Sequence, residues 1–209
     1  MTPLPKQKYT LEEYFELDKN AEGNFEYFDG EIFEMSGVSR QHATIEVNLI
    51  SKLNPVSINR GCQTFPANLR IKVPVLPTYR YPDLSVVCGG AIFERIAGLD
   101  CLVNPILIIE VLSESTEKYD RGEKFQQYKS IVSFKEYLLV SQETKLITLF
   151  QKHNERFWLQ SDYVAGETFH LTTLDLDLNV DEIYRGVELE PRPDETAEGN
   201  SDERNNFRR

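Results

Sequence analysis

A stretch of ten residues, NPILIIEVLS (104–113), constrains the fold more than any other part of the sequence. It is nearly continuous in isoleucine, leucine and valine, and a single charged residue, Glu110, interrupts it. Strands buried on both faces read as continuous apolar runs, whereas strands with one face in water alternate apolar and polar residues. The stretch therefore predicts a strand at the centre of a sheet that is covered on both sides.

Other segments predict the elements around this strand. Further strands are expected at 62–73, 81–88, 134–142 and 145–152, with shorter strands between 155 and 180. Helices are expected at 10–18, 40–53 and 121–130, with a helical turn at 181–187. The pair Asp29-Gly30 predicts a hairpin at 25–35, because both residues tolerate positive φ. This order predicts an α/β fold: a mixed central β-sheet flanked by α-helices, with an N-terminal helix and hairpin.

Capping and breaking residues predict where the helices begin and end. Thr10 with Glu13 three positions later is a capping box for the first helix. Ser39 is expected to cap the second helix, and Pro55 with the Asn59-Arg60-Gly61 turn is expected to end it. Asp120 is expected to be the N-cap of the helix at 121–130.

The composition indicates one folded unit with a polar tail. The chain has 209 residues, 40% of them hydrophobic, and no Gly/Ser-rich linker divides it, so we expect a single domain at 1–187. The last segment, 188–209, has seven acidic and four basic residues and almost no apolar ones. Such a segment cannot bury enough apolar surface to fold, so a disordered acidic tail is expected there.

Charge and cysteine content limit the classes of function. No apolar run approaches the roughly 20 residues that cross a bilayer, and the N-terminus lacks a secretory signal. We therefore expect a cytoplasmic protein without a membrane partner, in which Cys62, Cys88 and Cys101 are reduced, buried thiols. Neither Cys nor His clusters at zinc-ligand spacing. The net charge of −11 disfavours non-specific binding to phosphates.

Two carboxylates in apolar strands are the candidates for chemistry. Asp83 opens the apolar segment 81–88, and Glu110 interrupts the segment 104–113. Burying an unpaired carboxylate costs several kcal/mol, so such a group protonates or finds a cation. If the two strands are neighbours, the carboxylates converge, and together with a backbone carbonyl and waters they form a ligand set that suits Mg²⁺. The structural alternatives are a strand-end cap for Asp83 and an ion pair of Glu110 with Arg121 or Lys124.

A lysine in the following helix adds to this pair. Asp120, Lys124 and Tyr128 are spaced four apart, so they lie along one helical stripe. Lys124 is close to the point where the chain leaves the central strand, and its ammonium can return toward Glu110. A lysine beside a metal-bound water can orient the nucleophile or stabilise negative charge. The alternatives are a solvated lysine and a plain salt bridge to Glu110.

Five segments together resemble a known family. They are FEYFDGEIFEM, SxxHxxIxxxL, YPDLSVVC, NPILIIEVLSESTEKYDRGEKFQQYK and SFKEYLLVSQ. This ordered set resembles the Uma-type endonucleases, a bacterial branch of the PD-(D/E)xK restriction-endonuclease-like superfamily, over about residues 9 to 185. The resemblance implies a restriction-endonuclease-like mixed sheet with helices on both faces.

The resemblance also implies roles for site residues. Asp83 matches the PD aspartate and Glu110 the (D/E) acid, and both would ligate Mg²⁺, or Mn²⁺ as a substitute, with the carbonyl of Val111. The pattern departs from the superfamily at Leu112, where an ExK motif would have its lysine. Lys124 in DRGEKFxxY is the match for the displaced lysine, since only the position of the ammonium relative to the water matters.

Two further positions match polar positions of the family's pattern. Glu26 lies in the predicted hairpin, on the same face as Glu31, and His42 lies at the start of the second helix. Either can add a ligand to the site. The structural alternatives are a cross-strand partner for Glu26 and a hydrogen-bonded helix-start histidine for His42. His153 and His170 have no comparable context and are expected at the surface.

These observations support two main hypotheses. The first is Mg²⁺-dependent hydrolysis of phosphodiester bonds in nucleic acid, most simply by a DNA endonuclease. The second is a catalytically silent binding or regulatory module on the nuclease scaffold, which the acidic charge and Leu112 favour. Hydrolysis of a small phosphoester or glycosidic substrate has only the carboxylate pair in its favour.

Expectations about partners complete the prediction. The resemblance implies a nucleic-acid partner, with DNA as the expected type, and a homodimer, for which an apolar strand edge within 134–163 could serve. A local positive surface is expected from basic residues at five positions: Lys52, Arg60, Arg70, Lys72 and Arg80.

Overall fold

The apolar run at 104–113 forms β9 (Leu107–Leu112), and all six of its residues are buried. A computed structural model describes residues 8–21, 23–34, 37–75 and 78–189. In it β9 lies inside a six-stranded sheet of order β12-β11-β10-β9-β6-β3. The other strands are β3 (Cys62–Pro66), β6 (Leu84–Cys88), β10 (Glu136–Ser141), β11 (Leu146–Lys152) and β12 (Trp158–Val164). Since β9 is parallel to β10 and antiparallel to β6, the predicted mixed central sheet is confirmed.

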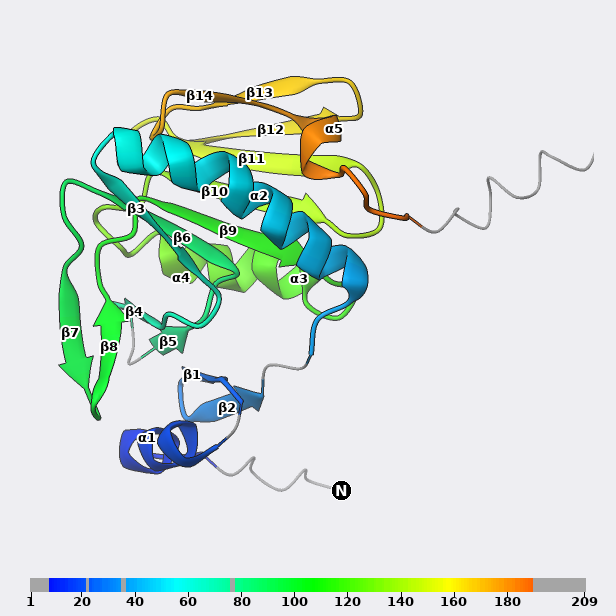
Figure 1. The fold of residues 1–209 in the computed structure, drawn as a ribbon. Helices are drawn as coiled ribbons and strands as arrows, with labels where there is room; N and C mark the ends of the chain where they lie inside the picture. Colours follow the sequence, from blue (N-terminus) through cyan, green and yellow to red (C-terminus); the bar gives the residue numbers. More distant parts are fainter. Residues whose placement is uncertain (1–7, 22, 35–36, 76–77, 190–209) are drawn as a thin grey trace, which may run out of the picture.

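Helices cover both faces of this sheet (Figure 1). The helix α2 (Arg40–Asn59) lies on one face, where Leu107, Ile109 and Val111 of β9 belong to its core. On the opposite face lie α3 (Glu117–Tyr119), the π-helical turn η1 (Asp120–Lys124) and α4 (Phe125–Tyr128), which enclose Ile108 and Leu112. The alternation of β9 between two apolar cores explains its continuous apolar sequence.

A second six-stranded sheet, of order β2-β1-β5-β4-β8-β7, lies below the first in Figure 1. Its strands are β1 (Phe25–Phe28), β2 (Glu31–Glu34), β4 (Ile71–Val73), β5 (Thr78–Arg80), β7 (Phe93–Ile96) and β8 (Leu99–Leu102). The helix α1 (Leu11–Asn20) packs on it through Tyr14. The predicted capping box at Thr10 is present, and the turn at Asp29-Gly30 has φ values of 45° and 85°.

Several predicted boundaries are wrong. The strand expected at 62–73 is two strands, β3 and β4, in different sheets, because a turn after Pro66 redirects the chain. The strand expected at 81–88 begins only at Leu84. The β7–β8 hairpin is not among the predicted elements, and its turn at Ala97-Gly98 has positive φ at both positions.

Pro55 does not end α2 as predicted. The helix continues to Asn59, because a proline removes one backbone hydrogen bond while tertiary packing supports the turns on either side. Leu53 and Ser57 are both buried, and the hydroxyl of Ser57 is 2.9 Å from that of Thr64 on β3.

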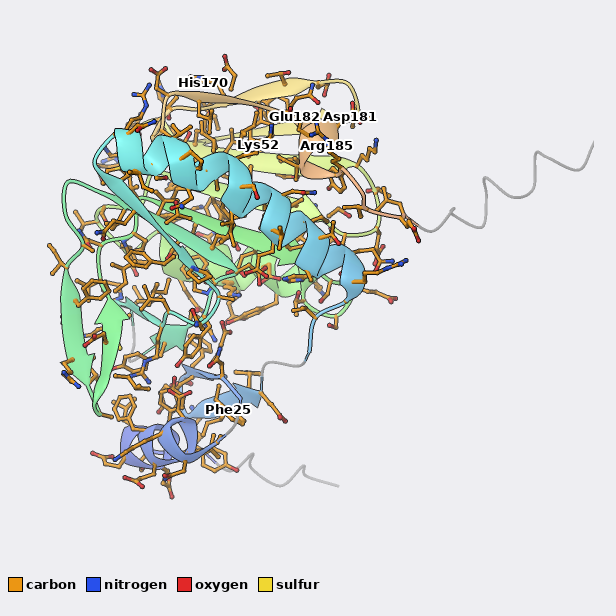
Figure 2. All side chains as sticks on the ribbon, in the orientation of Figure 1. Phe25, Lys52, His170, Asp181, Glu182 and Arg185 are labelled. Atoms are coloured by element: carbon orange, nitrogen blue, oxygen red, sulfur yellow. A yellow bond between two sulfur atoms is a disulfide. The ribbon has the colours of Figure 1, made fainter. Side chains whose placement is uncertain are left out.

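The C-terminal elements are fastened to the sheet by polar contacts. Both carboxylate oxygens of the buried Glu136 on β10 accept hydrogen bonds from the Thr172 and Thr173 backbone and hydroxyl groups. These threonines connect β13 (Thr168–Leu171) to β14 (Leu176–Asn179), which pair antiparallel. The turn α5 (Val180–Ile183) follows, and Glu182 forms a 2.8 Å ion pair with Lys52 of α2 (Figure 2).

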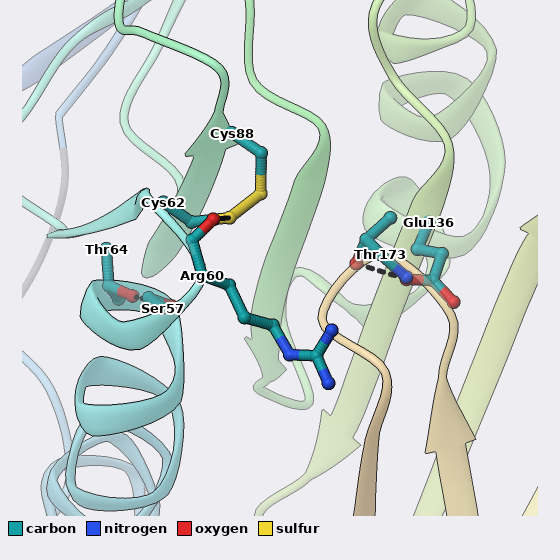
Figure 3. The surroundings of a disulfide bond; sticks show 7 residues. All are labelled: Ser57, Arg60, Cys62, Thr64, Cys88, Glu136 and Thr173. Atoms are coloured by element: carbon teal, nitrogen blue, oxygen red, sulfur yellow. Dashed lines mark hydrogen bonds between the residues drawn. A yellow bond between two sulfur atoms is a disulfide. The ribbon is translucent and has the colours of Figure 1, made fainter.

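The prediction of three reduced thiols is wrong for two of them. Cys62 and Cys88 form a disulfide between β3 and β6, as Figure 3 shows. The two residues are direct cross-strand partners in the antiparallel pairing, with their Cα atoms 4.1 Å apart, so neighbouring strands bring the sulfurs together. Cys101 is a free, buried thiol as predicted.

The predicted positive surface is also wrong. Arg70 and Arg80 are buried and paired with acids, Asp18 and Glu26 respectively. The remaining three basic residues form ion pairs at separate places: Lys52 with Glu182, Arg60 with Asp175, and Lys72 with Glu94.

Three other expectations bear on the chain as a whole. None of the described helices is long and apolar enough to cross a bilayer. The single domain at 1–187 stays a prediction. Of the tail predicted at 188–209, residues 190–209 lie outside the described part of the structure. His153 and His170 are exposed, as predicted.

Replacing both Cys62 and Cys88 by serine should lower the free energy of unfolding by about 3.5 kcal/mol, the chain-entropy value for a loop of this length. The bridged residues are 26 positions apart. Urea titrations without reductant measure the loss, and with reductant the wild type and the double variant should unfold at the same midpoint. Equal midpoints without reductant would contradict the bridge.

Candidate active site

The pairing of β6 with β9 places Asp83 and Glu110 on neighbouring strands. Asp83 directly precedes β6, in which Leu84 is the partner of Ile109 of β9. Asp83 accepts a 2.6 Å hydrogen bond from the backbone N–H of Val111. The two acids are only 7% and 4% exposed. The two strands are therefore neighbours, as the convergence of the carboxylates requires.

His42 completes the surroundings of Asp83. Ser39 caps α2, as predicted, by accepting a hydrogen bond from the N–H of His42. The Nε2 atom of His42 is 3.1 Å from Oδ1 of Asp83. Burial opposes protonation of the imidazole, but the hydrogen bond and charge of Asp83 raise the pKa of His42 above its ordinary value. His42 thus stands beside the PD aspartate.

Glu110 faces the opposite side of the sheet, toward η1 and α4. Its Oε1 atom lies 2.8 Å from the ammonium of Lys124 and accepts a 2.8 Å hydrogen bond from the hydroxyl of Tyr128. Burial raises the pKa of Glu110 well above its ordinary value; Lys124 opposes the shift, and the nearby charge of Asp120 adds to it. Glu110 is therefore in an ion pair, and its partner is Lys124 rather than Arg121, which pairs with Glu117.

Lys124 is the centre of a buried charge cluster. Its ammonium lies 2.8 Å from Glu110, 3.3 Å from Asp120 and 3.6 Å from Glu26, and the residue is 6% exposed. Burial lowers the pKa of Lys124, but the three carboxylates outweigh it and raise the pKa well above its ordinary value. The alternative of a solvated lysine is wrong. Leu112, in the place of an ExK lysine, is a buried core residue.

The local helix geometry differs from the prediction. Asp120 is not an N-cap, because the helical segment begins at Glu117 and the backbone of Asp120 is itself helical, with φ −63° and ψ −42°. Residues Asp120–Lys124 instead form a π-helical turn, a feature that often occurs at functional sites. Asp120 and Lys124, at the two ends of this turn, are both buried.

Glu26 reaches the site from the second sheet. One oxygen accepts a hydrogen bond from Arg80 at 3.0 Å, and the other accepts one from the backbone of Tyr81. Arg80 is fully buried and also donates to Gln127 and to the hydroxyl of Tyr119. Glu26 therefore contacts both the end of β5, which precedes Asp83 in the chain, and the ammonium of Lys124.

Sequence patterns alone do not identify several residues of the site. They predict a capping role for Asp120 and a surface position for Arg80, whereas both residues are buried in the site. Glu46 lies one turn beyond His42 on α2 and is half-buried; burial and the charge of Asp83 raise its pKa. The spacing of four residues from His42 was the available signal for Glu46.

The ligand types at the site suit a divalent cation. Four buried carboxylates, those of Glu26, Asp83, Glu110 and Asp120, lie among two buried cations, those of Arg80 and Lys124. Carboxylate oxygens are ligands that Mg²⁺ prefers. No three His, Cys, Asp or Glu side chains are grouped at metal distance within the described ranges, so a cation here would also need backbone or water oxygens.

Comparison with known proteins identifies the family. The family model described as "Putative restriction endonuclease", named Uma2, matches residues 11–181. The chain belongs to the Uma2 family. The resemblance in the five sequence segments is thereby confirmed.

Relatives of this Uma2 chain occur in cyanobacteria. It is 35% identical over 183 residues to "Uncharacterized protein slr1290" of Synechocystis sp. (strain ATCC 27184 / PCC 6803 / Kazusa), covering 88% of this chain and 95% of the relative. It is 32% identical over 157 residues to "Uncharacterized protein sll1609" of the same organism, covering 75% and 88%.

A solved structure supports the fold. A crystal structure from Anabaena variabilis ATCC 29413, titled as a "putative nuclease belonging to DUF820", superimposes with a TM-score of 0.69. The sequences are 19% identical, and the match covers 84% of the Uma2 chain and 97% of the solved one. The predicted restriction-endonuclease-like mixed α/β fold is confirmed.

Replacing Lys124 by methionine should destabilise the Uma2 chain by about 3–5 kcal/mol, because it leaves buried carboxylates without their cation. Lys118→Met is the matched control: Lys118 lies on the adjacent helix α3 and is exposed, so its loss should be within about 0.5 kcal/mol. Chemical denaturation of both variants measures the difference. Equal losses would contradict the buried cluster.

Proposed function

We propose that this Uma2 chain is a divalent-metal-dependent nuclease that hydrolyses phosphodiester bonds, most simply in DNA. The observation that carries the proposal is the burial of two carboxylates at the neighbouring strands β6 and β9: Asp83 accepts from the N–H of Val111, and Glu110 lies 2.8 Å from the ammonium of Lys124. The family description points to the same class of reaction.

In this proposal Asp83 and Glu110 hold Mg²⁺, or Mn²⁺ in its place, with the carbonyl of Val111, and Glu26 and His42 are accessory groups. When bound, such a cation activates water and neutralises charge on the phosphate.

The chain's own residues have separate tasks in this scheme. Tyr128 and Lys124 fix the orientation of Glu110, and the N–H of Val111 with His42 fixes that of Asp83. Lys124 is also the group that positions the attacking water and stabilises negative charge on the phosphate, because its ammonium takes the place of the missing ExK lysine beside Glu110. The relocation to η1 preserves the chemistry, since the ammonium and not its chain position matters.

Purified protein should convert supercoiled plasmid to nicked or linear forms only when Mg²⁺ or Mn²⁺ is present. Asp83→Asn should reduce the rate at least about 100-fold, because it removes a charge that the reaction needs. The matched control is Asp177→Asn, since Asp177 is an exposed aspartate on β14. It should cleave at the wild-type rate. Metal-independent cleavage, or equal activity of the two variants, would contradict the proposal.

A second candidate is a catalytically silent binding or regulatory module. The contacts that favour it are those of the site itself: Asp83 already bonds to His42 and Val111, and Glu110 already bonds to Lys124 and Tyr128. A site closed by its own ion pairs, with Leu112 in the ExK position, can serve as a structural core.

Calorimetric titration with Mn²⁺ separates the two candidates. The nuclease should bind the ion, and Glu110→Gln should weaken binding at least about tenfold, as expected for a lost metal ligand. Glu114→Gln, at an exposed position two residues beyond β9, should bind like the wild type. Absence of binding by the wild type would favour the silent module.

The proposed DNA substrate has consequences for the protein's cellular location and for the surface that contacts DNA. A DNA substrate places the protein in the cytoplasm, where the Cys62–Cys88 disulfide would be unusual. With basic residues paired to acids on several elements, contact with DNA is expected around the site rather than over a broad positive face.

A further inference from the structure

One exposed aromatic ring stands next to the candidate active site. Phe33 lies on β2, an edge strand of the second sheet, and is 43% exposed. Its direct cross-strand partner in the β1–β2 hairpin is Glu26. Side chains of such partners lie on the same face of the sheet, about 5 Å apart. Phe33 therefore shares a face with the carboxylate that lies 3.6 Å from the ammonium of Lys124.

The two faces of the hairpin have different roles. Tyr27 and Ile32, which alternate with Glu26 and Phe33 along the two strands, pack in the apolar cluster that contains Tyr14 of α1. Phe33 points to the other face and is not among the residues that form or line the three apolar clusters of the described chain. Its ring is therefore available for a ligand.

Buried contacts hold this hairpin against the site. Glu26 accepts a hydrogen bond from Arg80 at 3.0 Å. The guanidinium carbon of Arg80 lies 5.3 Å from the ring centre of Phe28 on β1 and 5.4 Å from that of Tyr119 on α3. Arg80 thus connects the hairpin with the helical segment that precedes Lys124. The position of Phe33 relative to the site is consequently fixed by the fold.

The neighbours of Phe33 do not suit an apolar protein interface. The sequence of β2 is Glu-Ile-Phe-Glu, so Glu34 follows the ring directly, and Glu26 is its cross-strand partner. Exposed apolar surfaces that bind proteins are contiguous patches, which these carboxylates interrupt. A nucleobase needs a single ring, because stacking uses the π-face that every base has.

The charge of the molecule favours an unpaired strand over a duplex. The chain has a net charge of −11, and three basic residues outside the site pair with acids: Lys52, Arg60 and Lys72. A duplex is held largely through neutralisation of its phosphates by lysine and arginine, for which such a surface offers little. An unpaired strand can also be held by base stacking on aromatic side chains.

We propose that Phe33 stacks on an unpaired base beside the phosphodiester bond at the candidate site, so that the substrate is single-stranded nucleic acid. The inference rests on the proposed nuclease function and adds the strandedness of the substrate to it. With its base on Phe33, a nucleotide directs the adjoining phosphate toward Glu110 and Asp83. Supercoiled plasmid offers such a substrate, because negative supercoiling favours local opening of the duplex.

The fluorescence of 2-aminopurine in a short single-stranded DNA measures the stacking. The titration omits divalent metal, so that the strand stays intact. The wild type should quench the probe, and Phe33→Ala should abolish the quenching and weaken binding at least about fivefold, the share of affinity that one base–aromatic stack supplies. Phe33→Tyr keeps a ring and should act like the wild type. Phe33→Leu is apolar without a π-face and should act like Phe33→Ala.

The matched control is Phe93→Ala. Phe93 is also 43% exposed and lies on β7, the opposite edge strand of the same sheet, where its ring contacts that of Phe65. This variant should bind and quench the probe like the wild type. Since Phe33 and Phe93 are equally exposed, both alanine variants should keep the circular dichroism spectrum of the wild type.

Cleavage assays separate this inference from the nuclease proposal. With Mg²⁺, the wild type should cut the single strand at least about tenfold faster than the same sequence as a linear duplex, because a duplex must first be unpaired. Phe33→Ala should lower kcat/KM for the single strand at least about fivefold. Quenching that depends on Phe33 without any cleavage would contradict the nuclease proposal and support the stacking. Equal cleavage of the two substrates, or equal losses in Phe33→Ala and Phe93→Ala, would overturn the inference and leave the nuclease proposal intact.

Discussion

The ion pair between Lys124 and Glu110 is the interaction on which the arrangement of the site depends. Both groups are almost fully removed from water, and neither charge is tolerable there without the other. Forming the pair requires the central strand β9, the π-helical turn η1 and, through Glu26, the hairpin of the second sheet. Because this contact involves three separate parts of the chain, it fixes their relative positions more precisely than apolar packing alone would.

Two buried arginines extend this network to the N-terminal part. Arg70 pairs with Asp18 of α1 at 2.8 Å and lies 5.1 Å from the ring centre of Tyr79. Arg80 pairs with Glu26 of β1. Because each guanidinium is desolvated, each needs its carboxylate in place, so α1 and β1 are bound to the strands that lead into Asp83. The helix and hairpin at the N-terminus are in this sense part of the site.

Strong local signals in the sequence predicted the centre of the fold well. The apolar run of β9, the Asp29-Gly30 turn and the Thr10 capping box all have a physical cause within a few residues. The burial of Asp83 and Glu110 at neighbouring strands was predictable too, since both interrupt apolar segments that must be buried. The π-helical turn was not, because Asp120 has the residue type and position of an N-cap, and its burial is decided by Lys124 and β9. The split of 62–73 between two sheets and the Cys62–Cys88 bridge depend on strand neighbours far apart in sequence, which alternation alone does not reveal.

The strand β3 has a consequence for assembly. It closes one side of the central sheet with Pro66, and its first residue is bonded to β6 by the disulfide. A sheet with two open edges can add copies without limit and grow into a filament, whereas a sheet with one open edge is finished once that edge is filled. Pro66 and the disulfide therefore make β3 a poor template for edge-to-edge growth of the sheet.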